Sequence, residues 1–358
     1  MITDMNLAFS FAAAWGYVWP ILVAVLAFLI MIFIHEFGHF IAAKAMGVRV
    51  NEFSIGFGPT LLKKQGKETL YCIKLLPFGG YCAMEGEDES SDDPKGFCNK
   101  KPWRRFLITA AGAVFNILFG FVIMMIILAP QERYTTTTVA AFADGASSAQ
   151  SGLAVGDQIL SVGGRSVLTT TDLSYTFTNI PADGRMDMTV RRNGEKIELS
   201  DVTFATESSD GINYISVDFY VQGVDRTPLT FLSQSVKTTV SYGRMVWWSL
   251  VDLVTGKFGV SQVSGPVGVT VAIGNAAKLG WDAFLPIITL ITVNLGVFNL
   301  LPIPALDGGR LFFILVEMIR RKPIPPKKEG LVHGIGFAVL MLFMALVTFK
   351  DIWGLIFK

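Results

Sequence analysis

The sequence is poor in charge. Only 16% of its 358 residues are Asp, Glu, Lys or Arg, whereas 51% are hydrophobic; a typical soluble domain has about 25% charged residues. This composition argues against a wholly soluble enzyme and excludes a disordered chain, which needs low hydrophobicity and high charge. The 30 basic and 29 acidic residues leave a formal net charge of +1. We therefore expect no nucleic acid partner.

Cysteine and histidine are also scarce, with three residues of each. The cysteines are Cys72, Cys82 and Cys98, and the histidines are His35, His39 and His333. Three cysteines cannot build a disulfide framework, so we expect free thiols on the reducing side of a membrane. A zinc site made of them stays open as an alternative, although their wide spacing is not that of a zinc knuckle.

Long apolar runs, in contrast, are abundant. A bilayer core about 30 Å thick needs about 20 mostly apolar residues to be crossed by a helix. Four segments meet this need: residues 17–43, 106–129, 281–301 and 331–349. Any one of them could instead be a buried helix of a large soluble core, but four together favour a multi-pass membrane protein. We expect the first to be retained rather than cleaved as a signal peptide, because no basic residue precedes Lys44.

Basic residues predict the orientation of the chain. Lys and Arg gather in residues 48–105 and in residues 310–328, after the third apolar segment. Such loops face the cytoplasm. The N-terminus, which carries Asp4 and no basic residue, and the long segment 130–280 are then expected outside.

The segments between the apolar runs predict β-structure. Residues 53–59 and 69–84 mix β-prone residues with Gly and Pro and are typical of short strands, partly at membrane depth. The acidic stretch 85–94 is expected to be a solvated loop. Residues 226–258, with Trp247-Trp248, predict an amphipathic helix on the outer surface, followed by an irregular stretch over 259–280.

Residues 135–225 predict a small soluble domain. A short helix after Ser147, an apolar strand after Gly156-Asp157 and a second helix near 172–179 precede a hairpin that turns at Asn193-Gly194. This order resembles a PDZ domain of the bacterial membrane-protease type, and such domains bind an extended peptide at a sheet edge. An unrelated small β-rich domain is the alternative.

The chemistry is concentrated in the first apolar segment. His35-Glu36-Phe37-Gly38-His39 is an HExxH motif. Residues four apart share one helix face, so both imidazoles can reach one zinc ion at about 2.0–2.1 Å, while Glu36 is free to accept a proton from a water. The alternative is a pair of hydrogen-bonded core histidines. A carboxylate and two imidazoles at membrane depth need a partner, however, and a divalent cation supplies one.

A catalytic zinc ion usually has three protein ligands. Asp307 follows Pro302 and Pro304, which stiffen the chain, and precedes two glycines that permit a tight turn. It is our candidate for the third ligand. Two alternatives stay open: Asp307 caps the helix that begins near Arg310, or His333 is the ligand.

Two motifs together resemble the site-2 protease family of intramembrane zinc metalloproteases. They are HExxH in the first span and NLLPIPALDGG, residues 299–309, in the third. Four spans with one PDZ-like domain between the second and third are similar to the bacterial regulator-of-sigma branch (RseP and RasP type). The stretch from Gly112 to Asn116 is also similar to a GxxxN pattern of that branch.

The resemblance implies a polytopic α-helical membrane protein with membrane-associated strands and one extracytoplasmic PDZ-like domain. The expected division is 1–46 (first span with HExxH), 47–105 (β-rich cytoplasmic part), 106–130 (second span), 135–225 (PDZ-like domain), 226–280 (amphipathic helix and connector), 281–310 (third span) and 331–349 (fourth span).

The resemblance also implies roles for residues. His35, His39 and Asp307 would bind one Zn²⁺, and Glu36 would act as general base and then protonate the leaving amine. The substrate-binding group would comprise Asn299, Pro302, Pro304, Gly112 and Asn116. The strands near the site would hold an unwound substrate by edge pairing.

The implied activity is regulated intramembrane proteolysis in the bacterial inner membrane. Substrates would be single-span membrane proteins, such as anti-sigma factors or remnant signal peptides, after a first cut by an upstream site-1-type protease. The PDZ-like domain would act outside as a size filter or docking site. The alternatives are a catalytically silent PDZ-bearing scaffold and a metal transporter.

Overall fold

The computed structural model describes residues 11–178, 180–181, 183–209, 212–259 and 262–357. These form two compact units, one made of the described residues up to 120 together with those from 263 onward, and one made of those between 121 and 262. Residues 1–10, for which we predicted an outside location, lie outside the described residues.

Four helices in the described part of the chain are long and apolar enough to cross a membrane. They are Val18–Ala45 within α1 (Phe11–Ala45), α2 (Pro102–Leu128), α7 (Trp281–Leu300) and Lys327–Ile356 within α9 (Pro326–Ile356). Each coincides with one predicted apolar segment. The expectation of a multi-pass helical membrane protein is confirmed.

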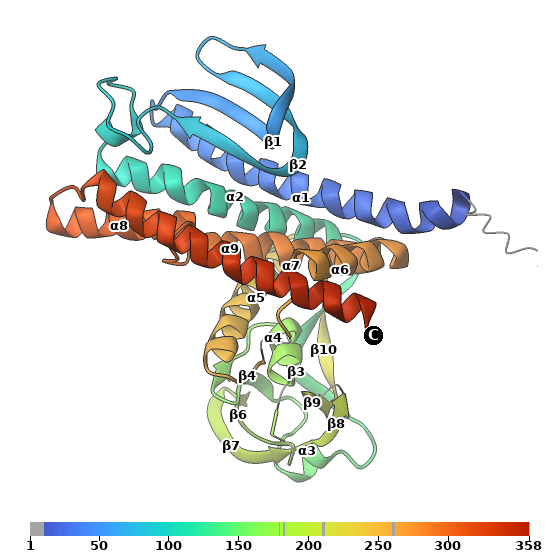
Figure 1. Cartoon of the computed structure of the whole chain (residues 1–358). Coiled ribbons are helices and arrows are strands. Elements are labelled where there is room, and N and C mark those ends of the chain that lie inside the picture. The colour runs from blue at the N-terminus through green and yellow to red at the C-terminus, as the bar shows by residue number, and fades with distance from the viewer. Residues whose placement is uncertain (1–10, 179, 182, 210–211, 260–261, 358) are drawn as a thin grey trace, which may run out of the picture. The chain divides into compact units, whose positions relative to one another are not determined.

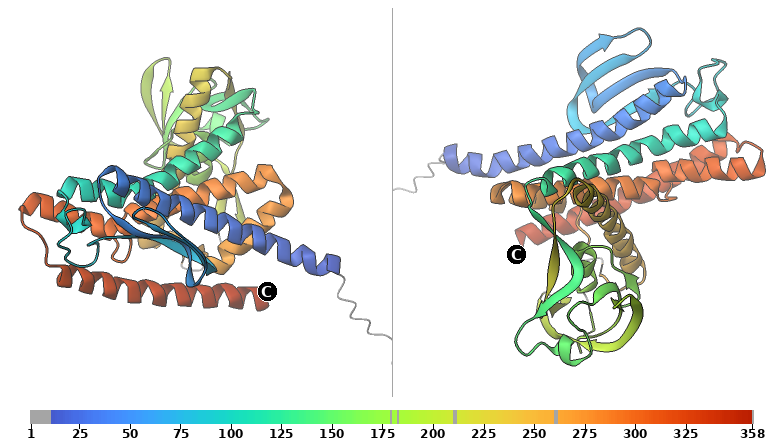
Figure 2. Two further views of the ribbon diagram at one scale, coloured as in Figure 1. Left: turned by 90° about the horizontal axis from the view of Figure 1, so that it is seen from above. Right: turned by 180° about the vertical axis from the view of Figure 1, so that it is seen from behind.

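Small residues bring α1, α2 and α7 into close contact. A Cβ atom added to Gly38 of α1 would lie 2.6 Å from the carbonyl oxygen of Ala111 on α2, and one added to Gly296 of α7 would lie 2.9 Å from that of Ala113. Glycine permits this approach of helix backbones in a membrane. As a result α2 lies between α1 and α7, as Figure 1 and the right-hand view of Figure 2 show.

The strands β1 (Val50–Gln65) and β2 (Leu70–Met84) form a two-stranded antiparallel sheet, followed by the 3-10 helix η1 (Phe97–Asn99). We predicted short strands here, and that prediction is wrong in length. Both strands are long and bend back, so that Phe53 pairs with both Cys82 and Tyr71. Gly56, with φ 82°, permits one bend. The returning end of β2 lies beside the HExxH segment of α1.

Helix α6 (Pro266–Leu279) precedes α7 and corrects the irregular stretch that we predicted for 259–280. Pro266 suits the first helical position because its missing N–H would have no partner there. The Asp351 carboxylate on α9 accepts hydrogen bonds from the backbone N–H groups of Gly265 and Gly268, both 2.8 Å. A cap contributed from α9 leaves no signal in the local sequence.

The second unit is built on a sheet with strand order β10-β3-β4-β6-β7, in which β5 also pairs with β4, and on a separate β8-β9 hairpin. The strands are β3 (Arg133–Phe142), β4 (Gln158–Val162), β5 (Arg165–Ser166), β6 (Arg185–Arg192), β7 (Glu195–Thr203), β8 (Ala205–Ser209), β9 (Ile212–Ser216) and β10 (Phe219–Asp225). The predicted hairpin joins β6 to β7, with positive φ at Asn193 and Gly194. A β-domain is confirmed at this coarse level.

Helices complete the second unit. The short α3 (Ser147–Gln150) and α4 (Thr170–Thr176) occur near the predicted positions. The amphipathic helix predicted over 226–258 is α5 (Pro228–Val254). It is fastened to the domain by polar contacts: Ser241 donates to the buried Asp172 carboxylate at 2.8 Å, and Arg165 forms an ion pair with Asp252.

Candidate metal centre

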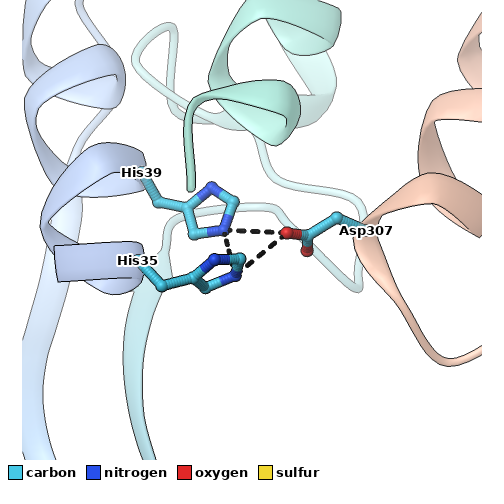
Figure 3. Close-up of side chains that lie close together, drawn as sticks. All are labelled: His35, His39 and Asp307. Atoms are coloured by element: carbon cyan, nitrogen blue, oxygen red, sulfur yellow. Dashed lines mark hydrogen bonds and ion pairs between the residues drawn. The ribbon is translucent and has the colours of Figure 1, made fainter. Parts of the chain in front are cut away.

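Three side chains from two distant segments converge on one point (Figure 3). His35 and His39 project from successive turns of α1, and Asp307 is the first residue of α8 (Asp307–Arg320). The Oδ2 atom of Asp307 lies 3.1 Å from Nε2 of His35 and 3.2 Å from Nε2 of His39. The two Nε2 atoms are 3.3 Å apart.

These distances fit a zinc ion. A tetrahedral zinc with ligand bonds of about 2.0–2.1 Å holds its ligand atoms about 3.3 Å from one another. The three observed distances are all close to that value, and the three side chains form a cluster able to hold a metal. Two imidazoles and one carboxylate are the ligand set of a catalytic zinc site with one open position.

The protonation of His39 supports the same interpretation. Its Nδ1 atom lies 2.9 Å from the carbonyl oxygen of Ile108. Because a carbonyl can only accept, Nδ1 carries the proton, and in the neutral ring Nε2 presents a lone pair to Asp307. The Oδ2 atom of Asp307 is buried and has no hydrogen-bond donor within the part of the chain that the structure describes. Lone pairs that face one another in this way are satisfied by a proton or by a metal cation between them, and the spacing of the three atoms fits zinc.

Gly112 and Asn116 of α2 both lie against the two histidines. Asn116 is fully buried, and its side-chain amide is 3.2 Å from Nδ1 of His35. Gly112 is so close to the rings that an added Cβ would overlap Nε2 of His39. Our sequence analysis grouped both residues with the substrate; the structure puts them in contact with the candidate metal ligands.

The turn between α7 and α8 delivers Asp307. The N-cap residue of α8 is Leu306, so Asp307 is a first-turn residue and not the cap that we considered as an alternative. Within the turn Ala305 has a φ of 76°, a left-handed conformation that is rare outside glycine. His333, the rival ligand, stands outside the three-residue cluster. Its Nδ1 atom instead accepts a hydrogen bond from the Ala305 N–H at 3.0 Å.

The candidate ligands and Glu36 open onto a cavity of about 330 Å³. The strand residues Tyr81, Cys82, Ala83 and Met84 form one wall of it. A Cβ added to Gly80 would lie 3.4 Å from Cγ of Glu36. The returning end of β2 therefore borders the position where a general base is expected.

Sequence reasoning missed the charged wall of this cavity. Arg310, one helical turn after Asp307, forms ion pairs with Glu87 and Asp88. The acidic stretch 85–94 is thus not wholly the solvated loop that we predicted. Burial raises the pKa of Glu87, and the opposing effect of Arg310 is smaller. The spacing of three residues between Asp307 and Arg310 was the only signal in the sequence, and it did not indicate the partners.

The other predicted site residues do not line this cavity. Asn299 is buried near the end of α7, and Pro302 and Pro304 lie in the turn that follows. The three cysteines are free, as expected. Among the described residues, no cysteine belongs to a cluster able to hold a metal.

Comparison with known proteins places the chain in a family. The model for peptidase family M50 matches residues 23–343. The chain belongs to peptidase family M50. This is the site-2 protease family, so the chain is a membrane-bound zinc metalloprotease, a hydrolase whose cofactor is Zn²⁺.

Curated relatives agree across nearly their whole length. A protein of Clostridium acetobutylicum, provisionally named a zinc metalloprotease, is 38% identical over 333 residues, which are 93% of this chain and 97% of the relative. One of Fusobacterium nucleatum with the same kind of name is 31% identical, with coverage of 93% and 98%. The regulator of sigma-W protease RasP of Bacillus subtilis is 28% identical, with coverage of 92% and 98%.

Proposed function

We propose that this M50 peptidase hydrolyses peptide bonds within or near the transmembrane segment of single-span membrane proteins. His35, His39 and Asp307 would hold the zinc ion, and Glu36 would be the general base. The observation that carries this proposal is the cluster of two helix imidazoles and one distant carboxylate with the spacing of zinc ligands.

The residues of the site have separate roles in the reaction. When bound, zinc supplies Lewis-acid polarisation of the scissile carbonyl. Glu36 accepts a proton from the attacking water and then delivers it to the leaving amine. The Ile108 carbonyl orients the His39 imidazole by accepting from its Nδ1–H, and Asn116 orients the His35 imidazole when its amide is turned so that Oδ1 accepts from Nδ1–H.

The position of β2 in the wall of the cavity suggests how the substrate backbone is held. A transmembrane helix hides its peptide bonds in internal hydrogen bonds and must unwind before it is cut. An unwound segment that pairs with the strand from Tyr81 to Met84 would lie beside Glu36, since both line the same cavity. We propose edge pairing here as the means by which the substrate backbone is presented, with Asn299, Pro302 and Pro304 bordering the substrate beyond the cavity.

The substrate class and topology are proposed from the family and from charge. The Bacillus subtilis relative is named as a regulator of sigma-W. We propose anti-sigma factors or remnant signal peptides, already trimmed by an upstream site-1-type protease, as substrates of this chain in a bacterial inner membrane. The PDZ-like domain, residues 135–225, and the N-terminus would lie outside, and the basic loops in the cytoplasm.

The first test separates chemistry from metal binding. Glu36→Gln should reduce cleavage of a trimmed single-span substrate in liposomes by about 10²–10⁴-fold while zinc content stays at one ion per chain. His39→Ala should lose both zinc and activity. Undiminished cleavage by Glu36→Gln would refute the assigned base. Equal zinc content in the wild type and His39→Ala would refute the ligand set and favour the silent PDZ-bearing scaffold.

The second test addresses the order of cuts. The same substrate is offered with its full outer domain and after trimming. Faster cleavage of the trimmed form, and loss of that preference when residues 135–225 are deleted, would support the role of the PDZ-like domain as a size filter. Equal rates for both forms would contradict it.

A further inference from the structure

The helix α9 has little contact with the rest of its unit. Only 6% of the most apolar stretch of this helix is buried. Near its start, however, it contacts the turn that carries Asp307. The contact is specific, because it joins one polar side chain and one glycine of α9 to two consecutive residues of the turn.

The polar contact is made by His333. Its Nδ1 atom accepts a hydrogen bond from the backbone N–H of Ala305 at 3.0 Å. Ala305 lies two residues before Asp307 and has a φ of 76°. A non-glycine residue in that conformation is strained and persists only where its surroundings hold it. The hydrogen bond from Ala305 to His333 is such a constraint, and without it a backbone donor would be left unsatisfied.

The second contact is made by Gly336, three residues later on the same face of α9. A Cβ atom added to Gly336 would overlap Cβ of Pro304 and lie 3.0 Å from its carbonyl carbon. The bare helix backbone therefore supports Pro304 while His333 holds Ala305. The ring of His333 is itself packed against Phe313 of α8, at 5.7 Å between ring centroids.

The same geometry excludes His333 as a zinc ligand in this arrangement. Its Nδ1 lone pair is used by the Ala305 N–H, so in the neutral ring Nε2 carries the proton. Neither nitrogen then has a lone pair to offer a metal.

We propose that His333 is a positioning residue for the third zinc ligand. By accepting the Ala305 hydrogen bond it holds the turn in the one conformation that presents the Asp307 carboxylate to His35 and His39. Gly336 assists by letting α9 approach Pro304. This inference rests on the zinc site assigned under the proposed function.

The test compares substitutions that differ in the acceptor. Asn places its side-chain oxygen where His has Nδ1, whereas Phe keeps the ring and removes the acceptor. Zinc affinity of the purified full-length protein is measured by competition with a chelator. We expect His333→Asn to bind zinc like the wild type and His333→Phe to bind it about tenfold more weakly, the lower end of the range for residues that support metal ligands. Gly336→Ala should weaken zinc binding as well, by displacing Pro304.

A double-mutant cycle with Asp307→Asn completes the test. If His333 acts through Asp307, His333→Phe should cause no further loss of zinc affinity in the Asp307→Asn background. The zinc-free His333→Phe protein should melt below His333→Asn, because the Ala305 N–H loses its acceptor, but it should remain folded at the assay temperature. A tenfold loss that persists without Asp307, or an equal loss in His333→Asn, would overturn the inference.

The two levels of the proposal fail in different ways. If Asp307→Asn binds zinc as tightly as the wild type, the ligand assignment itself is wrong. If Asp307→Asn weakens zinc binding but His333→Phe does not, the ligand assignment stands and only the positioning role is refuted.

Discussion

Gly112 offers a sharp test of the metal centre, because it is the point at which α2 contacts both histidine ligands. A Cβ atom built there would overlap Nε2 of His39 and lie 2.8 Å from its Cε1 and 2.9 Å from Cε1 of His35. Carbon atoms in ordinary contact are about 3.5–4.0 Å apart. In Gly112→Ala the rings must therefore retreat by roughly 0.7 Å or more, which exceeds the tolerance of about 0.2 Å for metal–ligand distances.

We expect Gly112→Ala to lower zinc affinity strongly and to change the stability of the fold little. Disturbing groups that only support metal ligands costs about 10–100-fold in affinity, and here the ligand atoms themselves are displaced, so we expect a loss of at least 100-fold. Alanine in a helix interior is favoured over glycine by about 1 kcal/mol, which offsets part of the packing strain. The zinc-free variant should thus melt near the wild-type temperature.

The assay is zinc affinity by chelator competition, together with a melting curve of the zinc-free protein. Gly120→Ala is the matched control on the same helix: its Cβ would lie 2.6 Å from a methyl group of Val293 and far along α2 from the histidines. It should share the packing strain and the helix-propensity gain but keep wild-type zinc affinity. Wild-type zinc binding by a folded Gly112→Ala protein would refute the ligand geometry.

Three other outcomes are expected. Asn116→Ala should weaken zinc binding by about 10–100-fold in chelator competition. Zinc at a hundred times its Kd should stabilise the folded protein by about 2.7 kcal/mol, seen as a higher melting temperature that chelator abolishes and that His39→Ala lacks. Burial alone would raise the pKa of Asp252, but hydrogen bonds from Arg165 and Tyr175 outweigh it and lower that pKa. The pair of Asp252 and Arg165 therefore stabilises the second unit at pH values above the ordinary aspartate pKa of 3.8, and this stabilisation is lost as the pH falls through the lower pKa of the folded state. Asp252→Asn should lower the free energy of unfolding by about 2 kcal/mol near neutral pH. A difference in melting temperature between the wild type and Asp252→Asn that is equal at all pH values would contradict this.

Local sequence patterns were enough to predict much of this structure. The four apolar helices follow from length and hydrophobicity, and the hairpin at Asn193-Gly194 follows from turn chemistry. The adjacency of His35 and His39 follows from their spacing of four residues, because a helix repeats every 3.6 residues. In each case the residues that interact are neighbours in sequence.

Predictions that depended on contacts between distant segments were wrong or incomplete. The helix of residues 266–279 was missed because its first turn is capped by Asp351 of α9. The stretch 85–94 was taken for a solvated loop because its acidic residues find Arg310 only in the folded chain. Asp307 was named as a candidate ligand from the prolines and glycines around it and then from a motif resemblance, but no local pattern could place its carboxylate beside α1.

The sequence by itself determined that this chain enters a membrane and carries one helix able to offer two imidazoles to a metal, since both properties depend on side chains a few residues apart. Only the tertiary structure decided how Asp307 meets those imidazoles, which carbonyl contacts His39, and that His333 contacts the turn before Asp307. These contacts join segments far apart in the chain, and their geometry depends on the packing of whole helices and strands.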